Sequence, residues 1–286
     1  MSKITHQELL DAGVHFGHLR RKWNPKMLPY IFAERKGVHV IDLNKTIEKL
    51  EEAAAAAKSI AKSGKKVLFV ATKKQAKEVV REAATRVNMP YVTDRWLGGM
   101  LTNFSTIRKS IKKMQSIDKM LTDVTLNSVT KKERLVLTRE KEKMERVLGG
   151  IANLNRVPAA VFLIDIGHEH IALKEAQRLN VNTFGLVDTN CDPTKVDFAI
   201  PGNDDASKSI FAITNFIADA IAEGLSERAT DDKEEDLEEE TQERLRFDGE
   251  SEGDADRKKA GGAGAPRKRS KSTTGAGNRP GGGPKK

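Results

Sequence analysis

The chain has 286 residues, which is enough for one large domain or two small ones with a buried core, and its formal net charge is +9. Its single cysteine, Cys191, excludes a disulfide scaffold and a zinc module built on several cysteines. No apolar run reaches the roughly 18–20 residues that cross a bilayer, and residues 1–8 lack the pattern of a signal peptide. We therefore expect a cytosolic protein with no membrane partner.

Charge is distributed unevenly along the chain. Residues 1–156 hold 32 basic and 16 acidic side chains, whereas residues 157–226 hold 4 and 10. Residues 227–256 hold 4 basic and 15 acidic side chains, and residues 257–286 hold 10 basic and no acidic ones. The basic first half indicates a polyanionic partner. The acidic part would repel phosphate and is the better candidate for protein contacts.

Taken in chain order, the apolar runs alternate between strand and helix patterns. Residues 30–32 and 38–41 flank a turn at 34–37 and predict a β-hairpin. Short apolar runs predict strands over 67–71, 91–93, 160–164, 183–187 and 198–200, and helical patterns cover 43–63, 73–87, 168–179 and 206–224. This alternation predicts a parallel sheet covered by helices on both faces, in a doubly wound α/β sandwich. Thr72 with Gln75 predicts a capping box at the start of the helix over 73–87.

Residues 103–156 interrupt the alternation and contain no strand pattern. Apolar residues recur there at three or four residues, and the link at 122–130 contains turn formers, which predicts an inserted antiparallel helical hairpin. Because the two helices would bury each other's apolar stripe, we expect the sandwich to fold without residues 105–153. The predicted domains are the sandwich (1–102 and 157–226), the hairpin (103–156) and a disordered acidic, then basic, tail (227–286).

Evidence for catalysis is weak. The turn over 71–74 lacks glycine and no Walker A spacing is present, which argues against a nucleotide-using enzyme on this fold. There is no nucleophile elbow, and we predict no enzyme, no cofactor and no small-molecule substrate. His15 and His18 could meet Asp188, Asp192, Asp204 and Asp205 at the carboxyl ends of strands and bind zinc or magnesium. Hydrogen-bonded structural histidines are the favoured alternative, and both interpretations stay open.

Basic side chains interleaved with aromatic ones indicate RNA binding, because cations neutralise phosphates while an aromatic ring stacks on a base. A loop kept out of helix by Pro25 and Pro29 supplies Arg20, Arg21, Lys22, Trp23, Asn24 and Lys26. A second cluster, over 94–104, supplies Arg95 and Trp96. The alternative for this cluster is that Trp96 packs inside the protein and that Thr102 serves as a helix N-cap. Further phosphate contacts are predicted at Lys73, Lys74, Arg108, Lys109, Lys112 and Lys113.

Several segments together resemble the bacterial family of small-subunit ribosomal protein two. They are 6–18 (HQELLDAGVHFGH), 23–27 (WNPKM), 95–104 (RWLGGMLTNF), 184–193 (FGLVDTNCDP) and 200–206 (IPGNDDA). The resemblance covers residues 3–226. It implies a Rossmann-like α/β domain with a protruding coiled-coil hairpin that binds small-subunit rRNA at the head–body junction of the ribosome, without catalysis. It also implies neighbouring ribosomal proteins as partners, including ribosomal protein one. A free regulatory RNA-binding protein on the same fold is the alternative.

Overall fold

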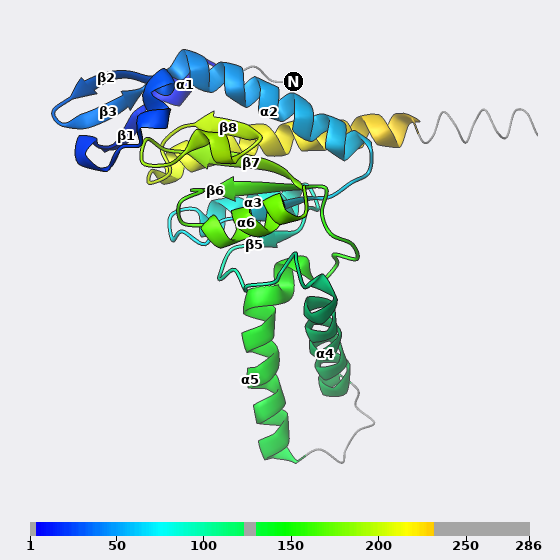
Figure 1. Ribbon diagram of the computed structural model, residues 1–286. Helices are drawn as coiled ribbons and strands as arrows, with labels where there is room; N and C mark the ends of the chain where they lie inside the picture. The colour runs from blue at the N-terminus through cyan, green and yellow to red at the C-terminus, as the bar shows by residue number, and fades with distance from the viewer. Residues whose placement is uncertain (1–3, 123–129, 232–286) are drawn as a thin grey trace, which may run out of the picture. The chain divides into compact units, whose positions relative to one another are not determined.

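The computed structural model describes residues 4–122 and 130–231, and a five-stranded parallel sheet forms its framework (Figure 1). The strands are β4 (Val67–Val70), β5 (Tyr91–Val92), β6 (Ala160–Ile164), β7 (Asn182–Val187) and β8 (Phe198–Pro201), in the order β5-β4-β6-β7-β8. The predicted strands and their parallel arrangement are confirmed. Almost every residue of these strands is buried, since helices cover both faces of the sheet.

The helices divide between the two faces of the sheet. On one face, α2 (Leu43–Lys62), α3 (Lys77–Arg86) and the helix over 207–231 pack around Phe69, Phe162 and Phe184. On the other, α6 (His170–Arg178) packs with Leu68 and Leu163. Successive side chains of a strand point to opposite faces, so each strand supplies both cores.

The last helix runs past its predicted end at residue 224. Lys58 of α2 forms an ion pair with Glu227 (2.5 Å), and Lys62 forms one with Asp231 (3.0 Å). These contacts accompany helical structure in residues 227–231, which the sequence assigns to the tail. The rest of the predicted tail, 232–286, lies outside the described residues.

A small antiparallel sheet precedes the sandwich. After α1 (His6–Asp11) come β1 (Phe16–Leu19), β2 (Ile31–Arg35) and β3 (Val38–Ile41), in the order β1-β3-β2. Lys36 (φ +53°) and Gly37 (φ +77°) form the turn between β2 and β3. Two consecutive left-handed residues match the twist of a tight hairpin, and the predicted hairpin is confirmed.

The insertion contains two long helices, α4 (Phe104–Thr122) and α5 (Lys131–Leu148), which extend side by side from the sandwich (Figure 1). Lys113 forms an ion pair with Glu140, and Asp118 with Lys141, both at 2.5 Å. Ile107 near the start of α4 and Leu148 at the end of α5 are buried in one cluster, so the two helices run antiparallel. Most of the predicted link between them, 123–129, lies outside the described residues.

The base of the hairpin belongs to the core of the sandwich. Ile107 and Ile111 of α4 and Leu148 at the end of α5 are buried in the same cluster as Leu68 of β4. Gly150 approaches β5 so closely that a Cβ there would lie 2.2 Å from the carbonyl oxygen of Tyr91. The expectation that the sheet does not need the hairpin's apolar stripe is therefore wrong for the base, because these side chains cover the sheet beside α6.

Both predicted helix caps are wrong. The helix after β4 begins at Lys77, and Thr72 instead donates its backbone N–H and its hydroxyl to Glu169. Likewise α4 begins at Phe104, and Thr102 donates its hydroxyl to Glu175 (3.1 Å). In each case a carboxylate from a distant part of the chain binds the threonine that the local pattern assigns to a cap.

Candidate nucleic-acid interface

The first basic cluster is held against the small sheet by backbone contacts. It consists of two short 3-10 turns, η1 (Arg20–Lys22) and η2 (Pro25–Tyr30), so the loop predicted there has local structure. The Arg20 N–H donates to the Gly37 carbonyl (3.0 Å), and the Asn24 N–H donates to the Thr189 carbonyl (2.8 Å). The Asn24 side chain accepts from the Lys26 N–H at 3.0 Å. These bonds fix the cluster between the turn of the small sheet and the loop after β7.

The cations of this cluster divide into paired and unpaired ones. Lys26 forms an ion pair with Asp192 (2.7 Å). Partial burial raises the pKa of Asp192, but hydrogen bonds from Lys26 and Thr194 lower that pKa to about 2. Arg20 pairs with Glu34 at 3.2 Å. Arg21 and Lys22 are exposed and form no ion pair within the described part of the chain, so both can meet a phosphate.

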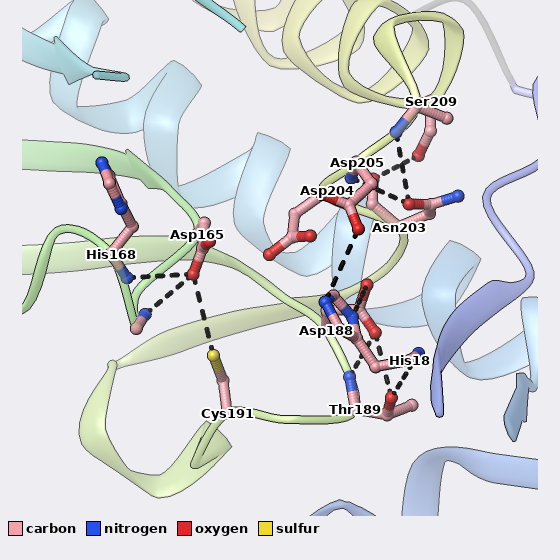
Figure 2. Close-up of polar contacts among 12 residues, drawn as sticks. His18, Asp165, His168, Asp188, Thr189, Cys191, Asn203, Asp204, Asp205 and Ser209 are labelled. Carbon is pink, nitrogen blue, oxygen red and sulfur yellow. Dashed lines mark hydrogen bonds and ion pairs between the residues drawn. The ribbon is translucent and has the colours of Figure 1, made fainter. Parts of the chain in front are cut away.

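Acidic side chains gather at the carboxyl ends of β6, β7 and β8 (Figure 2). Lys73, just after β4, lies among three of them, with Nζ 3.3 Å from Asp165, 2.9 Å from Asp204 and 2.6 Å from Asp205. Its side chain is only 17% exposed. These carboxylates bind the Lys73 ammonium, to which the sequence analysis assigned a phosphate. Lys73 is therefore not part of the RNA-binding surface.

His18 joins the same cluster from β1 (Figure 2). Its Nδ1 lies 2.9 Å from Asp188 and its Nε2 lies 3.5 Å from Asp205. The hydrogen bond to Asp188 raises the pKa of His18, against the lowering effect of burial. Burial and the charges of Asp165 and Asp188 raise the pKa of Asp204 to about 7, although Lys73 acts in the opposite direction.

Three of these residues could hold a cation. His18, Asp188 and Asp204 each present a ligand atom, and the three atoms lie within 4.8 Å of one another. One imidazole nitrogen and two carboxylate oxygens form a donor set that suits zinc or magnesium. His15 lies outside this group. His18 and Lys73 already bind these carboxylates directly. Such contacts are the ones expected if His18 is a hydrogen-bonded structural histidine, and they need no metal.

The acidic cluster lies where open α/β sheets bind nucleotides. Such ligands occupy the crevice beyond the carboxyl ends of the strands at the point where strand order reverses, which here falls between β4 and β6. Asp165, Asp204 and Asp205 surround Lys73 at this point. Since carboxylates repel phosphate, this chemistry agrees with the missing glycine motif and argues against a nucleotide site.

A buried carboxylate organises the second cluster. Glu175 of α6 is 8% exposed and accepts hydrogen bonds from the Trp96 indole (3.1 Å) and the N–H groups of Gly99 (2.7 Å), Leu101 (3.0 Å) and Thr102 (3.1 Å). Burial raises the pKa of Glu175, but these hydrogen bonds hold it below its ordinary value. Trp96 is 8% exposed, so the interpretation of Trp96 as a packed residue is the one that its burial supports. Arg95 beside it is exposed.

Sequence reasoning missed Glu175, although a signal was present. Ala172, Leu173 and Ala176 form the buried face of α6, and Glu175 lies among them. An acidic residue inside an apolar helical stripe is seldom buried without partners. That position pointed to a structural carboxylate whose donors come from elsewhere in the chain.

The hairpin carries paired and unpaired cations as well. Arg108 donates to the backbone oxygen (2.7 Å) and side-chain oxygen (3.2 Å) of Asn155, and Lys113 is bound to Glu140. Lys109 and Lys112 are exposed, as is Lys74 beside α3, and none of the three has an ion pair among residues 4–122 and 130–231.

Sequence reasoning also missed a stripe on α5. Arg139, Lys143 and Arg146 are exposed and spaced by four and three residues, so they lie along one face of the helix. The hairpin and the first basic cluster belong to separate elements, with the five-stranded sheet between them (Figure 1). The structure therefore does not merge the predicted residues into a single patch.

Comparison with known proteins identifies the family of the chain. The family model described as ribosomal protein S2 matches residues 9–224. Small ribosomal subunit protein uS2 of Cytophaga hutchinsonii is 64% identical over 219 residues, which cover 77% of this chain and 86% of the relative. The uS2 proteins of Chlorobaculum parvum and Flavobacterium johnsoniae are 58% and 59% identical over 221 and 220 residues, covering 77% of this chain and 88% and 87% of those proteins. Among the described residues, no helix has the length and apolar character that crossing a membrane requires. The family match over most of the chain and the identity of these relatives show that the chain belongs to the ribosomal protein S2 family.

Proposed function

We infer that this protein is a structural, non-enzymatic constituent of the small ribosomal subunit in the cytoplasm, and we propose that it binds small-subunit rRNA through two sets of exposed cations. One set is Arg21 and Lys22 beside Trp23. The other is on the hairpin, at Lys109 and Lys112 and along the α5 stripe. Lys74 and Arg95 add further contacts, and the site of binding is the head–body junction.

The pairing state of the cations carries this proposal. Lys26, Lys73 and Lys113 each contact a carboxylate at 2.5–2.9 Å, and that carboxylate already neutralises them. Arg21, Lys109 and Lys112 have no carboxylate partner within the described residues and face solvent. Phosphate neutralisation by such side chains drives most protein–RNA affinity. These unpaired side chains are therefore the ones that we assign to RNA.

The hairpin would present its cations well away from the sandwich. With about 1.5 Å of rise per residue, the 19 residues of α4 extend roughly 28 Å. We propose that α4 and α5 form a two-stranded coiled coil, with Met114 and Ile117 buried at its seam. The stripe of Arg139, Lys143 and Arg146 then follows the RNA backbone.

We also propose ribosomal protein one among the neighbouring proteins. Large apolar side chains are exposed on the small sheet, where Phe32 is 73% and Phe16 53% exposed, and on the adjoining turn η2, where Leu28 is 63% exposed. Exposed apolar side chains of this size can supply a protein-binding surface. Replacement of Phe32 by serine should reduce the amount of ribosomal protein one that copurifies with small subunits, while incorporation of this chain stays normal.

A charge-matched comparison tests the RNA proposal. One variant replaces Arg21, Lys109 and Lys112 by glutamine. Its control replaces Lys49, Lys62 and Arg86, which form ion pairs with Glu52, Asp231 and Asp219. The first variant should bind an rRNA fragment more weakly and flatten the salt dependence of log K by about 2–3. The control should behave like the native protein, and equal losses in both would show that only bulk charge matters.

Sucrose-gradient sedimentation tests assembly. The native protein should sediment with small subunits, whereas a free regulatory RNA-binding protein would stay near the top of the gradient. Membership of the ribosomal protein S2 family gives that alternative no support.

A further inference from the structure

A cavity of about 620 Å³ lies beside the first basic cluster. It is lined by Leu19, Arg20, Arg21, Trp23 and Gly37. These residues come from the end of β1, the turn η1 and the tight turn between β2 and β3. The volume falls in the range of small-ligand pockets.

The walls of the cavity are fixed by the fold. The Arg20 N–H donates to the Gly37 carbonyl (3.0 Å), and the Trp23 N–H donates to the Arg20 carbonyl (3.3 Å). The His39 ring lies 5.2 Å from the Trp23 ring, tilted by 43°, and His39 is only 7% exposed. Trp23 therefore has a buried neighbour and also lines the cavity, so the indole is presented to a ligand without first having to be ordered.

The lining combines two chemistries. The Leu19 side chain and the Trp23 indole offer an apolar and aromatic surface, while Arg20 and Arg21 offer guanidinium groups. Glu34 binds Arg20 at 3.2 Å and restricts where that guanidinium points. Arg21 is exposed and has no ion pair within the described chain. A ligand that fits this lining carries a flat aromatic ring and an anionic group a few ångströms from it.

We propose that this cavity binds one unpaired nucleotide of RNA, with the base against Trp23 and the phosphate on Arg21. This inference rests on the proposed function and specifies that this part of the surface binds single-stranded RNA. A paired base cannot supply the ligand, because its faces are stacked within the duplex, whereas unstacked bases bind aromatic side chains. The Arg21 guanidinium supplies the matching charge for the phosphate.

Fluorescence of the full-length protein tests the inference, since the chain has two tryptophans and Trp96 is buried. A single-stranded RNA hexamer should quench the emission of Trp23, and a blunt RNA duplex should not. By filter binding, Trp23→Leu should weaken hexamer affinity by roughly 5- to 100-fold, and Trp23→Phe, which keeps an aromatic face, should restore most of it. Duplex affinity should be the same in all three proteins.

A second variant avoids any effect on folding. Arg21→Gln alters an exposed side chain and should weaken hexamer binding and lower the salt slope of that binding by about 1.

An unchanged emission maximum of Trp96 in Trp23→Leu shows that the Trp23→Leu variant is folded. Unchanged hexamer affinity in folded Trp23→Leu, or equal quenching by the duplex, overturns the nucleotide site. If the native protein does not bind the rRNA fragment at all, the proposed function itself is overturned.

Discussion

The Glu175 carboxylate connects α6 to the loop that leads into the hairpin. It accepts from the indole of Trp96, from three backbone N–H groups and from the hydroxyl of Thr102. Gly99 has φ +90°, which lets the loop turn so that its N–H groups face one acceptor. A side chain far away in the sequence thus fixes the conformation of the 96–102 loop.

Glu175→Gln should destabilise the protein by about 2–3 kcal/mol, because an amide cannot accept from all these donors and leaves buried N–H groups unpaired. Chemical denaturation would measure the loss, and Trp96 emission should shift as its indole loses its partner. Lys174→Gln, an exposed neighbour on the same helix, is the control and should leave stability within experimental error. Equal stability of the two variants would contradict the role of Glu175.

The same carboxylate predicts a pH dependence. Because hydrogen bonding holds the pKa of Glu175 below its ordinary value despite burial, its contribution to stability is complete above the unfolded-state pKa of about 4.3. It is lost as pH falls through the folded-state pKa. The difference in melting temperature between the native protein and Glu175→Gln should therefore shrink as pH drops from about 6 toward 3. A constant difference would show that the charge of Glu175 is not responsible.

At the scale of elements, the base of the α4–α5 hairpin differs from the part of the hairpin farther from the sheet. Ile107, Ile111 and Leu148 at the base share a core with the sheet. Met114 and Ile117 are buried farther along α4, outside that cluster. The base therefore supports the sandwich, whereas Met114 and Ile117 lie outside both core clusters formed by the described residues.

Two deletions should separate these two parts of the hairpin. Replacing residues 114–141 by a short Gly/Ser linker keeps the base and should leave cooperative unfolding intact. It removes Arg139 and should weaken rRNA binding and incorporation into small subunits. Calorimetry and gradient sedimentation measure the two effects.

Replacing residues 105–153 is the comparison. It removes buried side chains that cover β4 and β5, and each buried Ile or Leu lost costs about 2–5 kcal/mol. We expect this variant to lose cooperative unfolding or to aggregate. If it instead melts like the native protein, the base is not part of the core.

At the scale of the whole molecule, the helix over 207–231 closes one face of the sandwich. Leu225 packs against its core, and Glu227 and Asp231 bind lysines of α2. Residues 232–286, which lie outside the described residues, have few apolar side chains and long runs of charge or glycine. This composition predicts that they add little to the core.

Ending the chain after Asp231 should therefore leave the melting temperature unchanged. Ending it after Gly224 removes Leu225 and the ion pairs and should lower the melting temperature measurably. Differential scanning calorimetry compares the two truncations with the full chain. A large loss on removal of 232–286 alone would show that the tail contributes to the folded core.

The limits of sequence-based prediction appear at particular residues. Strands such as β6 and β7 were predictable because each contains five consecutive buried residues, which leave a local pattern. Thr72 and Thr102 were misassigned as caps because their partners, Glu169 and Glu175, lie 97 and 73 residues away. Lys73 likewise looked like a phosphate ligand until the fold surrounded it with carboxylates.

The sequence by itself determined the α/β class, the order of strands and helices, the inserted hairpin and the family, since each is carried by local periodicity or contiguous motifs. Tertiary structure decided which cations remain available to RNA, because pairing with a carboxylate depends on residues far apart in the chain. It also decided that Trp23 lines a cavity while Trp96 is buried. Burial of an aromatic ring depends on what packs over it, and no local pattern distinguishes these two tryptophans.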